Sequence, residues 1–207
     1  MKHWKTILVA AVIAAILLSI ALVDRPLALW SYDTFHSVRK SFHALTRLVD
    51  YIEFLVLAGM MWSGFLFARG RKLTGRDAAI LRISLAVLSA IGLKDLLKTI
   101  FGRTWPETWV DHNPSFITDH VFTFSPFHGG VGWSSFPSGH ETVTAAFCAA
   151  LWILAPRLRW LCVLTLAVVA VGLLGADEHW LSDVFAGGLV GWLTGVLVAK
   201  VELPKAA

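Results

Sequence analysis

The sequence predicts an all-α polytopic membrane protein, a bundle of six transmembrane helices in a single domain over residues 1–207. Of the 207 residues, 57% are hydrophobic and only 15% are charged, whereas soluble domains average about a quarter charged residues. Apolar runs recur along the chain near the length of about 20 residues that a helix needs to cross the hydrocarbon layer. A chain of this length suits one domain.

Six apolar runs predict the six helices. They cover residues 6–23, 51–68, 78–100, 138–155, 160–175 and a last stretch that begins between 177 and 183 and ends before 200. Basic residues before the first run are also typical of a secretory signal peptide. However, Asp24-Arg25-Pro26 follows this run without a clear small-residue cleavage site, which favours a retained helix.

Two longer segments connect the runs. Residues 24–50 mix aromatic and aliphatic side chains with polar ones, which predicts an amphipathic segment at the membrane interface. Residues 102–137 contain eight tryptophan and phenylalanine residues, a composition typical of the headgroup region. This long, aromatic-rich loop is either an interfacial anchor or a lid or groove for a lipid tail.

The distribution of lysine and arginine predicts that both termini are cytoplasmic. Ten of these residues fall in segments on the side of the N-terminus and five on the opposite side, and cytoplasmic segments carry the excess. The outer face then gathers the ends of the third and fifth runs and the starts of the fourth and sixth. We therefore expect a bacterial-type inner membrane protein with its chemistry on the periplasmic face.

Other compositional signals are weaker. The net charge of +4 does not indicate nucleic-acid binding, because the basic residues flank apolar runs, where topology signals belong. Cys148 and Cys162 lie within apolar runs and predict buried free thiols. Gly187, Gly191 and Gly195 recur every four residues and predict close helix packing within the chain, with homodimerisation as the alternative.

The segment Pro137-Ser138-Gly139-His140-Glu141 predicts a helix start that can bind an anion. A serine followed three residues later by glutamate is a capping-box pattern. Free backbone N–H groups and the helix dipole favour an anion there, and glycine lets a ligand approach the backbone. His140 would lie in the first turn, beside the anion; an ordinary capped helix with a surface histidine is the alternative.

His179 and Asp183 predict an activated histidine. Four residues apart on a helix, the two side chains would share a face, and the carboxylate would fix the imidazole tautomer and leave the other nitrogen free to attack or accept a proton. A helix-capping pair is the alternative. We find no cluster of three ligand-type residues at metal-binding spacing, so we expect no metal site.

Lys98 and Arg103, near the end of the third run, predict phosphate binding. Phosphoryl transfer depends on positioning and on stabilisation of charge, and cations supply both. Lys94, one turn earlier, competes for the role of Lys98, although it has Asp95 or Glu53 as alternative partners. A cationic helix end with no further role is the other interpretation.

These motifs, in this order, resemble those of the type 2 phosphatidic acid phosphatase superfamily, six-span helical proteins with the patterns Lys-x6-Arg-Pro, Pro-Ser-Gly-His and Ser-Arg-x5-His-x3-Asp. The resemblance covers Lys98 to Asp183, and the second motif is identical. It implies a reaction without metal or other cofactor. His179 would form a phosphohistidine, Asp183 would orient it, and His140 would protonate the leaving oxygen. The phosphate oxygens would be held by Lys98, Ser138 and Gly139.

The chain departs from the family pattern at two arginines. Trp105 stands at the arginine of the first motif, and Gly172-Leu173 stand at the Ser-Arg of the third. Neither replacement offers the bidentate donors of a guanidinium. We expect Arg103, two residues before the usual position, to reach the same phosphate oxygens.

The sequence therefore predicts a membrane hydrolase of lipid phosphates or diphosphates, with a phosphorylated lipid and the membrane as its partners. The candidate substrates are polyprenyl diphosphate, phosphatidic acid, phosphatidylglycerol phosphate and lipid A phosphates. Two alternatives stay open. One is a phosphotransferase that uses the same phosphohistidine, and the other is a lipid-binding protein that lost turnover with its two arginines.

Overall fold

The computed structural model of the chain describes residues 3–109 and 112–202. Its regular structure is helical, and the bounds of the α-helices are α1 (His3–Leu18), α2 (Asp24–Phe35), α3 (Arg39–Thr46), α4 (Leu48–Ala68), α5 (Gly75–Phe101), α6 (Phe116–Asp119), α7 (Gly139–Leu154), α8 (Arg159–Gly175) and α9 (Leu181–Ala199). A π-helical turn, Ser19–Val23, joins α1 to α2.

The six predicted apolar runs correspond to α1, α4, α5, α7, α8 and α9. Within residues 3–109 and 112–202, three helical stretches are long and apolar enough to cross a membrane by length and composition, namely His3–Ala68, Pro156–Gly175 and Leu181–Ala199. Gly139–Leu154 is apolar but shorter. The prediction of an all-α protein with several apolar spans is therefore confirmed.

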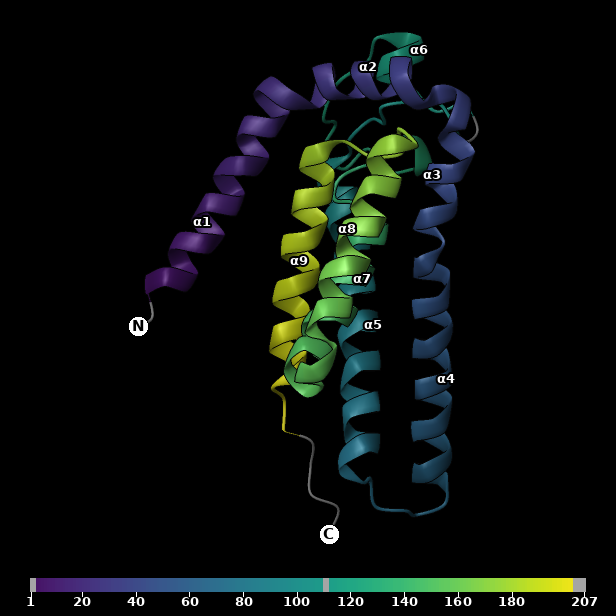
Figure 1. Ribbon diagram of the computed structural model, residues 1–207, viewed down its shortest axis with the longest axis vertical. Helices are drawn as coiled ribbons and strands as arrows, with labels where there is room; N and C mark the ends of the chain where they lie inside the picture. The colour runs from purple at the N-terminus through teal and green to yellow at the C-terminus, as the bar shows by residue number, and fades with distance from the viewer. Residues whose placement is uncertain (1–2, 110–111, 203–207) are drawn as a thin grey trace.

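The long helices α4, α5, α7, α8 and α9 stand side by side, and α2 and α6 lie across one end of them (Figure 1). Helix α1 leans away from the others toward its N-terminal end, which lies about halfway along the bundle in this view, whereas Ile16 near its other end shares a buried cluster with Ala186 of α9 (Figure 1). The segment 24–50 is thus largely helical, and its first part closes one end of the bundle.

Helices α7 and α9 approach each other closely through glycines. A Cβ atom at Gly187, Gly191 or Gly195 would lie 2.6, 2.2 or 2.4 Å from a backbone carbonyl oxygen of α7 or its N-cap residue. The glycine stripe is therefore used for packing within the chain. Because the two helices are in contact from their first turns, the segments that carry His140 and His179 meet at the same end of the bundle.

The aromatic-rich loop between α5 and α7 folds over that end. Trp180 packs against Phe116 and Phe122, with ring centroids 5.7 and 4.8 Å apart. Phe136 packs against Phe124 at 5.7 Å. These side chains form part of the protein's own interior here, so the loop is more than an anchor for the membrane surface.

The buried cysteines agree with the sequence interpretation. Cys148 and Cys162 are both buried and both free thiols. Each Sγ lies near the backbone oxygen of the other residue, at 3.7 and 3.5 Å. They contribute to the contact between α7 and α8.

Candidate active site

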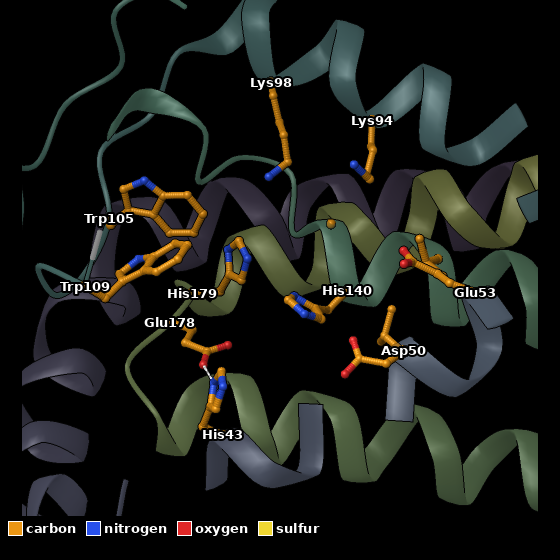
Figure 2. A pocket seen from close by; sticks show the side chains of 13 residues that line it. His43, Asp50, Glu53, Lys94, Lys98, Trp105, Trp109, His140, Glu178 and His179 are labelled. Atoms are coloured by element: carbon orange, nitrogen blue, oxygen red, sulfur yellow. Dashed lines mark hydrogen bonds and ion pairs between the residues drawn. The ribbon is translucent and has the colours of Figure 1, made fainter. Parts of the chain in front are cut away.

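Side chains from α3, α4, α5, α7, the loop after α5 and the segment before α9 line a pocket of about 280 Å³. Figure 2 shows His140 and His179 near its centre, with Lys94 and Lys98 extending toward them from α5. The full lining is His43, Val49, Asp50, Glu53, Lys94, Lys98, Trp105, Trp109, Gly139, His140, Val143, Glu178 and His179.

His179 is paired with Asp183, as the spacing suggested, but not on a shared helix face. Helix α9 begins at Leu181, so His179 lies before it. The Nδ1 atom of His179 is 3.3 Å from Oδ2 of Asp183. Because Asp183 occupies the first turn of α9 and also accepts a hydrogen bond from the Trp180 N–H at 3.2 Å, the carboxylate both caps the helix and orients the imidazole.

The buried carboxylate of Asp183 accepts further hydrogen bonds from two side chains. Ser135 donates its hydroxyl to Oδ2 at 2.5 Å, and Arg103 donates from Nη1 to Oδ1 at 2.5 Å. With both oxygens occupied, Asp183 stays an acceptor for the Nδ1–H of His179. The Nε2 atom of the same ring is then left with its lone pair for chemistry.

Arg103 is not placed where we expected a phosphate ligand. Its residue exposure is 0%, and it is absent from the residues that line the pocket. Besides Asp183, its guanidinium bonds Asp24 from Nη2 at 2.7 Å and the hydroxyl of Ser182 from Nη1 at 2.6 Å. The two buried carboxylates bind this guanidinium, which leaves it behind the histidine, away from the open pocket.

The turn of the chain at Gly102 explains this orientation. Gly102 ends α5 in the left-handed conformation, with φ 55°, and its N–H bonds the carbonyl oxygen of Lys98 at 2.9 Å. A Cβ at this position would lie 1.9 Å from the carbonyl oxygen of Ser125. The tight turn leads Arg103 into the interior directly after the helix, where the loop covers it.

Asp24 is a functional candidate that sequence reasoning missed. It stands at the start of α2 and is 1% exposed. Its carboxylate accepts hydrogen bonds from Arg103, from the Ser182 N–H at 3.0 Å and from the Ser182 hydroxyl at 2.5 Å. Because its partners lie far along the chain, no local pattern marks it.

His140 lies in the first turn of α7, half-buried, and lines the pocket as predicted. Ser138 is the N-cap residue, and its hydroxyl accepts from the Glu141 N–H at 3.4 Å. The reciprocal half of the expected capping box is absent, because the Ser138 N–H donates to the carbonyl oxygen of Asp183 at 3.0 Å. Ser138 is buried and does not line the pocket, so its observed role is structural.

Lys98 and Gly139 lie together on the pocket wall. Lys98 donates from Nζ to the carbonyl oxygen of Ser134 at 2.6 Å, and its Nζ is 5.4 Å from the ring centroid of Trp105. A Cβ at Gly139 would lie 3.7 Å from Cε of Lys98. The lysine is therefore held beside the start of α7, where backbone N–H groups favour an anion.

Trp105 forms an aromatic wall at the position of the missing arginine. Its ring packs against His179 with centroids 4.9 Å apart, and its Nε1 donates to the carbonyl oxygen of Val131 at 2.8 Å. Trp109 packs edge-on against it at 4.8 Å and is 50% exposed. The two rings exclude water from one side of His179, and burial lowers the pKa of this histidine, against the opposing effect of Asp183.

Further pocket residues come from the start of α4 and from α3. Asp50 and Glu53 line the side opposite the tryptophans, while His43 forms an ion pair with Glu178 (Figure 2). Sequence reasoning did not assign His43 or Asp50 to the site, because nothing local links the segment 24–50 to the three motifs, and it considered Glu53 only as a partner for Lys94. Among the described residues, no group of three or more histidine, cysteine or carboxylate side chains is arranged to hold a metal ion.

Residues 79–205 match the family model of the PAP2 superfamily. The chain belongs to this superfamily of membrane lipid phosphatases. The matched region contains all three motifs, and it extends over more than half of the chain. The protein is thus a multi-pass membrane protein of a hydrolase family that works without a metal ion.

Two curated relatives are lipid A 1-phosphatases, from Rhizobium etli and Rhizobium johnstonii. Each is 38% identical over 118 residues, which is 54% of this chain and 47% or 44% of the relative. The chain therefore spans about half the length of the curated relatives it matches.

The fold is similar to a crystal structure of a transmembrane PAP2-type phosphatidylglycerolphosphate phosphatase from Bacillus subtilis. The TM-score is 0.55 at 18% identity, and the match covers 92% of this chain and 93% of the other. At this identity the likeness establishes the fold alone.

Proposed function

We propose that this PAP2 protein hydrolyses the phosphate ester of a membrane lipid through a phosphohistidine on His179. The observation that carries this proposal is the contact of 3.3 Å between Nδ1 of that histidine and Oδ2 of Asp183, from which we infer the tautomer with its proton on Nδ1. Its Nδ1 faces a carboxylate held by three other donors, Arg103, Ser135 and the Trp180 N–H, so Nε2 is the nitrogen left to act as a nucleophile.

In the first step, Nε2 of His179 attacks phosphorus and a P–N bond forms while the bond to the lipid oxygen breaks. His140, in protonated form, gives its proton to the leaving lipid oxygen. In the second step a water molecule attacks the phosphohistidine, His140 takes a proton from that water, and the P–N bond breaks to release inorganic phosphate. Asp183 stabilises the positively charged phosphoimidazole that the first step forms, and the second step returns His179 to its neutral form.

The anion site for the phosphate group is assigned to Lys98 and the Gly139 N–H. Both line the pocket beside the two histidines, and the first turn of α7 adds the favourable end of its dipole. Ser138, which is buried as the N-cap, supports this site through the helix start. Arg103 is reassigned from a phosphate ligand to a residue that positions Asp183.

For the substrate we infer a lipid A-type 1-phosphate, in which the phosphate is attached to a sugar. Two relatives named for this activity are 38% identical to this chain over 118 residues. The half-exposed ring of Trp109 beside the pocket offers a flat apolar surface, and Asp50 and Glu53 offer acceptors for sugar hydroxyl groups.

The proposed topology has one domain with six spans, α1, α4, α5, α7, α8 and α9, and both termini in the cytoplasm. The pocket then faces the periplasm. A reporter domain fused after Lys200 tests this orientation. A cytoplasmic signal is expected, and a periplasmic signal would reverse the topology.

The activity is tested with purified full-length protein in detergent micelles containing EDTA. Phosphate release is measured from lipid A 1-phosphate, phosphatidic acid, phosphatidylglycerol phosphate and a polyprenyl diphosphate, with His179→Ala as the matched variant. We expect release from the sugar-linked phosphate to be fastest, to survive EDTA and to disappear in the variant. Equal release by His179→Ala would contradict the mechanism, and transfer of phosphate to another lipid without free phosphate would favour a phosphotransferase.

A further inference from the structure

We propose that Lys94 is a second phosphate-binding cation of this pocket and takes over the task of a guanidinium that the chain lacks. This inference rests on the proposed function, because it concerns the same anion site. The family pattern places arginines where this chain has Trp105 and Leu173. Neither of these side chains carries charge, so the pocket needs another source of positive charge for a phosphate dianion.

The position of Lys94 fits that task. It lies one helical turn before Lys98 on α5 and lines the same pocket. Figure 2 shows both lysine side chains extending from α5 toward the histidines. A Cβ at Gly139 would lie 3.4 and 3.5 Å from Cδ and Cε of Lys94, and 3.7 Å from Cε of Lys98. The two lysines therefore pass on the same side of the anion-binding start of α7.

Arg103 and Arg39 have carboxylate partners outside the pocket lining. The lysines and arginines that line the pocket are Lys94 and Lys98. Arg103 is bound to Asp24 and Asp183, and Arg39 forms an ion pair with Glu107 outside this lining. Lys94 is thus the available replacement for a missing phosphate-binding guanidinium.

The present partner of Lys94 is one that a phosphate group can replace. Its Nζ pairs with Oδ1 of the adjacent Asp95 at 2.6 Å, and the side chains are 17% and 59% exposed. An ion pair with such an exposed carboxylate contributes little. Lys98, in contrast, is fixed by the carbonyl oxygen of Ser134. Lys94 can therefore exchange the Asp95 carboxylate for a phosphate oxygen without leaving a buried charge unpaired.

A direct binding experiment tests this role. The dissociation constant of inorganic phosphate is measured by calorimetry for the full-length protein in micelles, alongside kcat and KM for lipid release. We expect Lys94→Met to weaken phosphate binding and lower kcat/KM by about 10- to 100-fold, the effect of one hydrogen bond to a charged group. Lys94→Arg keeps the charge, and we expect it to stay within about fivefold of the native protein, roughly 1 kcal/mol.

The matched variants separate a ligand contact from a structural contribution. Asp95→Asn removes the competing carboxylate, so phosphate should bind more tightly by about 1.5- to 5-fold, the size of an exposed ion pair. A purely structural role of the Lys94 to Asp95 pair predicts no such gain. Arg76→Met, on the exposed first turn of α5 at its other end, should change neither constant.

The outcomes distinguish this inference from the proposed function. Loss of phosphate affinity in Lys94→Met, with no lipid turnover by the native protein, would support the Lys94 contact and contradict the phosphatase. Phosphate affinity that is unchanged in Lys94→Met would overturn the Lys94 contact whether or not turnover occurs. Native protein that binds no phosphate would overturn it as well.

Discussion

The two sides of His179 differ in how their polar groups are satisfied. Behind the ring, Asp183, Arg103 and Asp24 form a buried chain of ion pairs, with side chains no more than 1% exposed. In front of the ring, Lys94 and Lys98 reach into an open pocket, and Lys94 has an exposed carboxylate as its ion-pair partner. Behind the ring, the charged groups are paired with one another inside the protein. In front of the ring, we propose that the lysine ammonium groups pair with a bound phosphate group.

This contrast explains why two kinds of cation are present. A guanidinium has five donors in a fixed fork and suits a permanent site between two carboxylates. Lysine ammonium groups are flexible point charges that can exchange partners. In the proposed mechanism the arginine positions the nucleophile through Asp183 and the lysines bind the phosphate group, whereas we expected Arg103 to bind phosphate together with Lys98.

The largest effect should follow from breaking the rear of the site at its centre. Asp183→Asn removes the charge that fixes the His179 tautomer and stabilises the imidazolium, and we expect kcat to fall by about 10³- to 10⁴-fold. Ser182→Ala, which removes one of the hydrogen-bond partners of Arg103, is the neighbouring control and should cost far less. Steady-state phosphate release measures kcat for both variants. A kcat of Asp183→Asn within tenfold of the native value would contradict the role assigned to Asp183.

Arg103→Met should act mainly on stability. It leaves Asp24 and Asp183 as buried carboxylates without their cation, a change that costs about 3–5 kcal/mol. Denaturant unfolding in micelles measures this loss. Adding Asp24→Asn should recover part of it, because one of the uncompensated charges is then removed.

The same Arg103 variants also separate its two possible roles in the reaction. If Arg103→Met remained as stable as the native protein but raised KM for the lipid, Arg103 would be a phosphate ligand after all. A lower stability combined with a lower kcat and little change in KM fits a residue that positions Asp183.

A smaller effect concerns pH. Burial holds the pKa of His179 below its ordinary value of 6.5, so the unprotonated nucleophile persists as the solution is acidified past pH 6.5. The acid limb of kcat/KM, which reports the free enzyme, should therefore lie below pH 6.5 once the titration of the substrate phosphate is divided out. Trp105→Ala admits water beside the ring and should move the limb upward, while Trp109→Ala should move it less. A native limb at or above pH 6.5 would contradict this.

Much of the fold was predictable because its signals are local. The apolar runs located α4, α5, α7, α8 and α9 to within a few residues, since hydrophobic length is a property of each segment alone. The glycine stripe on α9 indicated close packing, and the structure identifies α7 as the partner. The membrane orientation is still a prediction from charge counts.

The pocket residues that belong to the three sequence motifs could be predicted, because each motif is recognisable within its own segment. Lys98, Gly139, His140 and His179 line one pocket, as their motifs suggested. The direction of Arg103 was not predictable, because it depends on a turn at Gly102 and on Asp24, which is 79 residues away. The sequence shows how many residues separate Arg103 from the first motif. The direction of its side chain depends on the carboxylates that bind it, and these are distant in the sequence.

The most direct test of the account is the location of the phosphoryl group during turnover. Native protein is mixed with lipid substrate, quenched in base within the first turnover, and digested for mass spectrometry. The account predicts an acid-labile phosphoryl group on His179 that is absent from His179→Ala. Phosphate release without any phosphorylated histidine, or with the label on His140 instead, would contradict it.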